Sequence, residues 1–425
     1  MVIRTVVLLG LGGAVLNRLV RLSTRVSTSA VAKIIQQTLA LLFPIMLLGS
    51  FAEVLKFTFL TPSGYMARLF NIPGWLPFAG ELAGVMGVVF HCTIDMIALY
   101  GAYGAAYYTA KRYANPELAP ITGATGILAF LMIAYRPVAG NSLNFSNALM
   151  AEGLLVALVV GYFCGRIMGW LTHATMTSAS FQLLTPILVI MVLAAIVSLL
   201  EHIGGTLELP TYLASFVTQH SQGHVLLYVL GLGALTDLLA WMAIGGPFIN
   251  APTFTDAPSW ANMNSALRQG SAWNVPYPFT DTTLFHSFAN FGGSGVTLAL
   301  IMAILLFSKQ ARSRTVSKWA IFPAIFNNHY PMMMGIPVLF NPIFLIPFVL
   351  APLVNMVIAA GFILLKWVPV AAYPVPAGTP GPLIAFIGTN GNWLSLLLGA
   401  GLITLDVLIY WPFVQLADRV TEVGR

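Results

Sequence analysis

The stretch "FPAIFNNHYPMMMGIPVLFNPIFLIPFVLAPLVN", from Phe322 to Asn355, decides the fold. It is apolar enough for a membrane interior, yet it carries six prolines and the polar run Asn327 to Tyr330. Prolines at this density should interrupt a helix repeatedly. Irregular backbone at membrane depth survives only where protein or water satisfies its amide groups. The stretch therefore predicts a polar cavity inside a membrane protein.

The composition of the whole chain supports this interpretation. Of 425 residues, 58% are hydrophobic and 8% are charged, and the mean hydropathy is +0.86. No soluble core of this size buries so much apolar surface. The net charge of +6 comes from short basic clusters between apolar runs, which are typical of cytoplasmic loops rather than of nucleic-acid binding. We therefore expect a polytopic protein in contact with lipid, with no nucleic-acid partner.

Apolar stretches long enough to cross a bilayer, about 20 residues, recur along the chain. They lie near 34–58, 80–110, 117–135, 148–170, 180–203, 222–242, 284–307, 343–367 and 392–415. If Lys33 is cytoplasmic, successive crossings place the next basic clusters on the same side, as the positive-inside rule requires. The sequence thus predicts an all-α membrane protein with a cytoplasmic N-terminus.

The chain is expected to divide into three parts. Residues 1–33 end in basic residues, so they fit an amphipathic interfacial segment better than a secretory signal. Residues 34–215 form a regular transmembrane half. Residues 216–425 contain the interrupted segments 243–283 and 320–342, and such paired interruptions indicate a transporter's substrate site.

No motif indicates a metal or a bound cofactor. Cys92 and Cys164 lie in apolar runs without metal-ligand spacing, and the chain has no Walker loop, HExxH or GxSxG motif. We expect neither a metal nor a cofactor, and these motifs assign no catalytic residue.

Polar groups in the second half are the candidates for the site. The turn at Gly292 to Leu300, "GGSGVTLAL", either offers free amides to a ligand or permits tight helix packing. His329 either exchanges protons or belongs to a self-satisfied turn. Asp281 is the carboxylate best placed to line a cavity, whereas Glu53 is expected to lie near a helix end and face the interface.

These residues resemble a known family. "FNNHYPMMMGIPVLFNPIFLIPFVLAPLVN" resembles the FNINEP, GLPIVLNP and PFxLAPLVN signature of enzyme IIC, the membrane permease of bacterial phosphotransferase systems of the lactose/cellobiose/chitobiose family. "IALYGAYGAAYYTAKRY", "VPAGTPGPLIAFIGTNGNW" and "IYWPFVQLADR" are similar to other family segments, in the same order. The resemblance covers residues 31–419 approximately.

The resemblance implies a homodimer in the bacterial inner membrane, with about ten transmembrane helices per chain and re-entrant hairpins in the C-terminal half. The N-terminal half would then make the dimer contact. The substrate would be a sugar, expected to be a disaccharide, and its hydroxyl would be phosphorylated through the cytoplasmic phosphocarrier proteins enzyme IIB and enzyme IIA. In the family, the FNINEP glutamate and a histidine in a GIHG-type turn line this site.

The chain departs from the family at both positions. Tyr330 stands at the glutamate position and His329 at the asparagine before it, while Gly245 or Gly246 of "WMAIGG" replaces the histidine. Ala377 lies near the position of a family tryptophan. Neutral tyrosine, with a pKa around 10, is a poor base at pH 7.

Three interpretations therefore stand: a phosphorylating permease that uses His329 or Asp281 as its base, an uncoupled carrier or sensor, or a membrane enzyme on a lipid-linked substrate. We favour a permease. His329 would accept a proton, Asn327 and Asn250 would bind hydroxyls, and Trp273 would stack on a sugar ring. The expected lining is Gly245, Gly246, Asn250, Trp273, Asp281, Ser294, Asn327, His329 and Tyr330.

Overall fold

The computed structural model describes residues 21, 23–25, 28–137, 143–144, 146–174, 179–203, 225–249 and 257–423. This part of the chain is almost entirely helical; its one sheet pairs the two-residue strands β1 (Arg136–Pro137) and β2 (Leu143–Asn144). The helices are α3 (Ala30–Val54), α4 (Tyr65–Phe70), α5 (Ile72–Trp75), α6 (Ala79–Thr93), α7 (Ile97–Tyr113), α8 (Ala119–Ala134), α9 (Leu154–Ala174), α10 (Ala179–Ile203), α12 (Val225–Trp241), α13 (Ala257–Gln269), α14 (Thr297–Phe307), α15 (Ala311–Ile325), α16 (Tyr330–Gly335), α17 (Pro342–Leu364), α18 (Gly381–Gly388) and α19 (Trp393–Val423).

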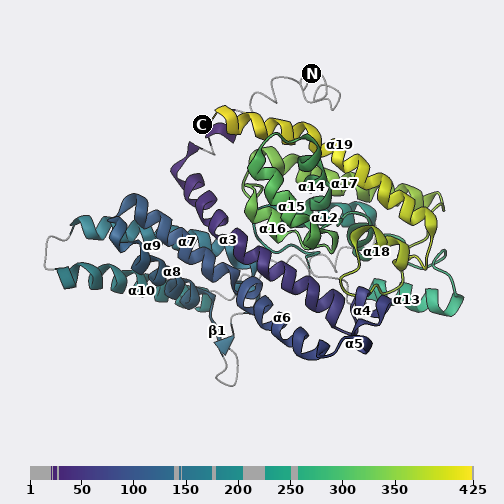
Figure 1. The fold of residues 1–425 in the computed structure, drawn as a ribbon, viewed down its shortest axis with the longest axis horizontal. Coiled ribbons are helices and arrows are strands. Elements are labelled where there is room, and N and C mark those ends of the chain that lie inside the picture. Colours follow the sequence, from purple (N-terminus) through teal and green to yellow (C-terminus); the bar gives the residue numbers. More distant parts are fainter. Residues whose placement is uncertain are drawn as a thin grey trace.

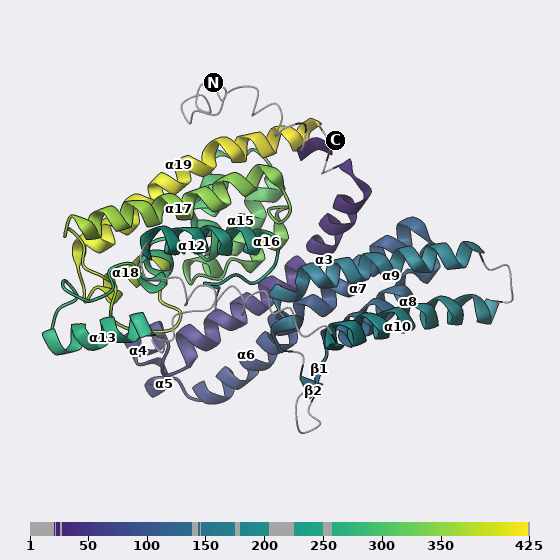
Figure 2. The ribbon, with the colours of Figure 1, turned by 180° about the vertical axis from the view of Figure 1, so that it is seen from behind.

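Helices α7 to α10 form a bundle on one side of the molecule (Figures 1 and 2). Small residues let these helices approach closely. A Cβ atom added to Gly161 of α9 would lie 2.5 Å from the carbonyl oxygen of Ala102 and 2.8 Å from the Cβ atom of Ala105, both on α7. Such small-residue packing is the usual way in which helices associate in lipid, where no hydrophobic force draws them together.

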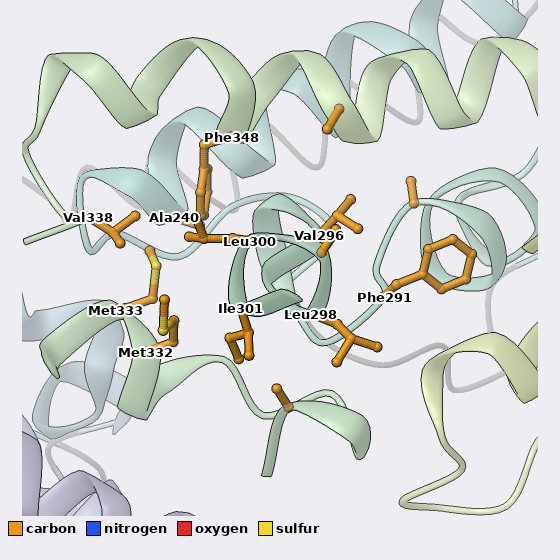
Figure 3. Close-up of a cluster of buried hydrophobic side chains, with 14 of the residues drawn as sticks. Ala240, Phe291, Val296, Leu298, Leu300, Ile301, Met332, Met333, Val338 and Phe348 are labelled. Carbon is orange, nitrogen blue, oxygen red and sulfur yellow. The ribbon is translucent and has the colours of Figure 1, made fainter. Parts of the chain in front are cut away.

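Helices α12 and α14 to α19 pack around a second core, on the other side (Figures 1 and 2). Helix α14 lies inside it, and Val296, Leu300 and Ile301 are fully buried. Phe348 of α17 and Met333 of α16 pack into the same cluster (Figure 3). This core holds in place the turns before α14 and α16.

Helix α3 lies between the two groups (Figures 1 and 2) and contacts α6 and α7 as well as α15 and α16. After Val54 it continues as a π-helix over Leu55–Leu60. The last turns of α3 therefore face the connection between α15 and α16.

Among the residues that the structure describes, six helical segments are long and apolar enough to cross a membrane. They are Ala30–Leu60, Ala79–Tyr113, Pro116–Ala134, Ala151–Thr172, Pro342–Leu364 and Trp393–Val420, with shorter apolar helices at Leu184–Leu200, Val225–Trp241 and Ser294–Phe307. The predicted all-α membrane architecture is confirmed at this level. The count of ten spans, the re-entrant hairpins and the division at residue 215 stay predictions.

Two predicted spans are not single helices. Residues 284–307 contain a buried turn, and α14 begins only at Thr297, because Gly292, Gly293 and Gly295 adopt positive φ angles. The stretch 80–110 breaks between α6 and α7 at a 3₁₀ turn, Ile94–Met96.

The expectation that these prolines repeatedly interrupt a helix was wrong for α17. Pro342 occupies the first turn, where a missing N–H costs nothing, and the side-chain oxygen of Asn341 accepts a hydrogen bond from the Ile343 amide at 3.1 Å. Pro347 and Pro352 lie within the continuous helix. Neighbouring groups commonly accommodate such prolines in membrane helices.

Candidate functional site

A cavity of about 370 Å³ lies where the interrupted segments meet the end of α3. Both ends of the 243–283 segment contribute to its wall, as do the turn before α16 and residues 371–384. Its lining residues are Glu53, Phe248, Ile249, Thr282, Phe285, His286, Ser287, Asn290, Gly293, Ser294, Phe326, Asn327, Asn328, His329, Tyr330, Ala371, Tyr373, Val375, Pro376, Ala377, Gly378, Thr379 and Ile384. Amides, hydroxyls, imidazoles and one carboxylate thus face a common space.

The glycine turn before α14 forms one wall. Gly293 has φ +95°, and a Cβ atom there would collide with the imidazole ring of His329. The Gly295 amide donates to Oδ1 of Asp237 at 2.9 Å, and the hydroxyl of Tyr410 donates to the Gly295 carbonyl at 2.5 Å. The Gly292 and Gly293 amides also donate within the protein, which favours the packing interpretation of the turn. Ser294 lines the cavity.

Asn327 connects two walls of the cavity. Its backbone is left-handed, with φ 68°, a conformation that asparagine tolerates better than most residues. Its side-chain oxygen accepts from the Gly292 amide at 3.1 Å, and its side-chain nitrogen donates to the Thr379 carbonyl at 2.9 Å. Asn327 therefore lines the cavity as expected, but its side chain also holds the two walls together.

His329 and Tyr330 begin α16 and line the cavity side by side, with ring centroids 4.5 Å apart. Both lie outside the candidate spans. Burial lowers the pKa of His329 to about 4, so its imidazole is neutral at pH 7. Burial and the nearby carboxylates of Glu152, Glu53 and Asp95 raise the pKa of Tyr330, which stays protonated.

Glu53 lines the cavity and does not face the membrane interface, so that expectation was wrong. Its Oε2 atom accepts from Nδ2 of Asn328 at 2.5 Å. The side-chain oxygen of Asn328 accepts from the Ser50 hydroxyl at 3.0 Å. Contact with a turn 275 residues away, rather than any local pattern, brings this carboxylate to the site.

His286 is a second lining residue that the sequence did not single out. It lies in a short π-helix, Thr282–His286, and its Nε2 atom is buried without a hydrogen-bond partner, 4.0 Å from Oδ2 of Asp281. Burial lowers its pKa to about 4. The polar residues directly before the glycine turn could have indicated it.

The remaining predicted residues lie elsewhere. Asp281 adjoins His286 but does not line the cavity, and Trp273 is 42% exposed away from it. Gly245 lies against Glu152 and Gly246 against Thr236. Asn250 lies outside the described residues, as do residues 1–20 of the predicted interfacial segment.

Residues within 371–384 form another wall of the cavity, which the sequence analysis did not assign to the site. The Ala377 carbonyl accepts from the Tyr65 amide at 2.9 Å, and Gly378 packs directly on Thr58 of the π-helix after α3. The prolines and glycines of "YPVPAGTPGP" mark irregular backbone, which is the signal that could have placed this segment.

The arrangement suits a ligand rich in hydroxyl groups. Asparagine, serine and threonine side chains offer both donors and acceptors, and Phe248, Phe285 and Tyr373 supply ring faces. Among the described residues, no group of three or more His, Cys, Asp or Glu side chains is placed to hold a metal ion.

Comparison with known proteins identifies the family of the chain. The family model "Phosphotransferase system, EIIC" matches residues 36–352. A putative permease IIC component, YwbA, of Bacillus subtilis is 26% identical, and the alignment covers 89% of each chain. The oligo-beta-mannoside-specific EIIC component of the same organism is 23% identical over 95% of this chain and 93% of its own.

Among solved structures, the IIC component of the N,N'-diacetylchitobiose-specific phosphotransferase system, ChbC, is similar, with a TM-score of 0.42 and 21% identity. The match covers 94% of this chain and 96% of that one. The family model alone spans well over half of the sequence. The chain therefore belongs to the EIIC family of the phosphotransferase system.

Proposed function

We propose that this EIIC-family chain carries a β-linked disaccharide across the bacterial inner membrane. A hydroxyl group of the sugar is phosphorylated in the cavity by a cytoplasmic EIIB protein, which receives its phosphoryl group from EIIA. The observation that carries the proposal is the cavity of about 370 Å³, which has polar groups on every wall. Ligand sites of this kind typically have volumes of about 300–1,000 Å³. One relative that matches over nearly its whole length is named for oligo-beta-mannosides, which suggests a β-linked sugar.

In this proposal His329, Tyr330, Ser294 and Asn327 contact the sugar, and Asp281 acts through its neighbour His286. Trp273 and Asn250 contribute only if their segments close over the bound sugar. The chain forms a homodimer through the N-terminal half, with residues 34–215 as the regular part and 216–425 as the substrate-binding part. The N-terminus lies in the cytoplasm, on the side of the basic clusters.

Uptake into proteoliposomes tests this function. The vesicles are supplied with labelled β-1,4-mannobiose, cellobiose or chitobiose, with and without a phosphorylated EIIB protein from a β-glycoside system. Mass spectrometry then identifies the product inside the vesicles. Phosphorylated sugar inside is the expected result. Unmodified sugar would show an uncoupled carrier, and no uptake or binding of any sugar would refute the proposal.

A further inference from the structure

This inference rests on the proposed function and concerns the fate of one proton. When a sugar hydroxyl is phosphorylated, an O–P bond forms and the bond between phosphorus and the donor atom breaks, leaving its electron pair on the donor protein. The hydroxyl proton must leave as well, and a side chain within about 3 Å has to receive it. That side chain must line the cavity.

Few of the lining residues can take a proton. Tyr330 and Tyr373 are phenols and stay protonated near neutral pH. His286 and His329 are buried, so an imidazole that accepts the proton becomes a cation in surroundings that penalise charge. A carboxylate that accepts the proton becomes neutral instead. Glu53 is the only carboxylate among the described residues that line the cavity.

Two hydrogen bonds orient Asn328 toward Glu53. Its side-chain oxygen accepts from the Ser50 hydroxyl at 3.0 Å and from the Tyr330 amide at 3.2 Å, which leaves Nδ2 to donate to Glu53 at 2.5 Å. Asn328 is 5% exposed. The amide therefore holds one carboxylate oxygen in a fixed place and links it to the turn that carries Tyr330.

The end of α3 is itself fixed against the cavity walls. The ring of Phe51 stacks on Phe322 of α15 with centroids 5.1 Å apart, and the ring of Phe59 meets Phe326 edge-on at 5.7 Å. On the other side, Thr58 packs directly against Gly378. These three contacts fix the position of Glu53 relative to the cavity.

A purely structural role does not account for this carboxylate. Within the described part of the chain, no lysine, arginine or histidine forms an ion pair with Glu53. Removing a carboxylate from water without a compensating cation is costly, and such groups concentrate at functional sites. A carboxylate can accept about four hydrogen bonds, so the bond from Asn328 leaves room for a substrate hydroxyl.

We propose that Glu53 accepts the proton of the sugar hydroxyl as a phosphorylated EIIB protein transfers its phosphoryl group, and that Asn328 positions the carboxylate. The phosphoryl group moves from the phosphoprotein to the sugar oxygen, and the proton moves from that oxygen to Glu53. The carboxylic acid returns the proton to water after the sugar phosphate leaves. A residue of the N-terminal half thus completes the chemistry of the C-terminal half.

The test compares wild type with Glu53→Gln in detergent and in proteoliposomes. Glutamine has the same shape and still accepts a hydrogen bond from Asn328, so we expect sugar binding to change less than about threefold. Formation of sugar phosphate should fall by at least about 100-fold, the usual contribution of a positioned base. Glu81→Gln, at an exposed carboxylate in the first turn of α6, is the matched control and should behave as wild type.

Each outcome decides something different. Sugar phosphate formed by Glu53→Gln at the wild-type rate overturns the role of Glu53 and leaves the proposed function intact. Equal losses of binding and phosphorylation make Glu53 a binding or structural residue and overturn its role as proton acceptor. If wild type binds sugar but never phosphorylates it, coupling and the inference both fail.

A second variant protects the test against misfolding. Glu53→Asp keeps the carboxylate but withdraws it by one methylene, so it should retain measurable phosphorylation at a reduced rate. If Glu53→Gln does not elute as a folded protein, Glu53→Asp decides the question: a reduced rate of phosphorylation with intact sugar binding supports the role of Glu53, and an unchanged rate overturns it.

Discussion

The bundle α7–α10 and the region from α12 to α19 solve different problems with similar residues. The bundle is made of regular helices, and none of its described residues has a positive φ angle. Apart from Asn71 and Phe78, every described residue with positive φ lies between 243 and 391. Glycine in the bundle lets neighbouring helices approach closely, whereas glycine beside the cavity allows a backbone with positive φ. The comparison teaches that irregular backbone is concentrated where the site is built.

The largest effect should come from Gly293→Ala. At φ +95° an alanine is strained, and its Cβ atom meets the His329 ring, so we expect a loss of about 3 kcal/mol or more in stability, together with the loss of sugar uptake. The melting temperature in detergent and proteoliposome uptake measure the two effects.

Gly361→Ala is the control within the same region. No heavy atom lies within 4 Å of a Cβ atom at Gly361, in the last turn of α17, so we expect a gain of about 0.5–1 kcal/mol from lower backbone entropy in the unfolded chain. Equal effects of the two substitutions would contradict the conformational account of the turn.

Asn327→Ala should have the next largest effect. It removes the hydrogen bonds to Gly292 and Thr379 and places alanine at φ 68°, which together should cost about 2–3 kcal/mol. Asn327→Gly keeps the backbone conformation and loses only the hydrogen bonds. The difference in melting temperature between the two variants isolates the cost of the left-handed backbone; identical values would show that the turn relaxes freely.

The sequence predicted well where the signal was local. The turn at Asn327, His329 and Tyr330 carries polar side chains within an apolar stretch, and all three line the cavity. The position of Glu53 depends on packing between α3 and a distant turn, which no window of the sequence contains. Trp273 was expected in the cavity because its segment is polar, but part of that segment forms the peripheral helix α13.

In the bundle, Gly161→Ala should cost about 2 kcal/mol. Its φ angle is ordinary, so the cost comes from overpacking against the Ala102 carbonyl and the Ala105 methyl group. Sugar binding per folded molecule should be unchanged, because the bundle does not line the cavity. Gly84→Ala on α6, with nothing within 4 Å of the added atom, is the control for melting temperature. Weaker sugar binding by folded Gly161→Ala would break the division between the two regions.

The smallest effect per residue is the loss of stability at acid pH. Burial lowers the pKa of His286 and of His329 from 6.5 to about 4. Below pH 6.5 the unfolded chain therefore binds more protons at these two residues than the folded chain does. Stability should therefore fall as the pH falls from 6.5 toward 4, by about 1–2 kcal/mol per histidine between pH 7 and 5.

Melting curves of His286→Gln and His329→Gln at pH 7 and 5 check this, since each variant should lose less stability on acidification than wild type. None of the described buried residues of the bundle is a histidine, so the bundle should contribute no such acid dependence. If both variants retain the full acid dependence of wild type, the histidines are hydrated within the cavity, and the walls around His286 and His329 are looser than their burial indicates.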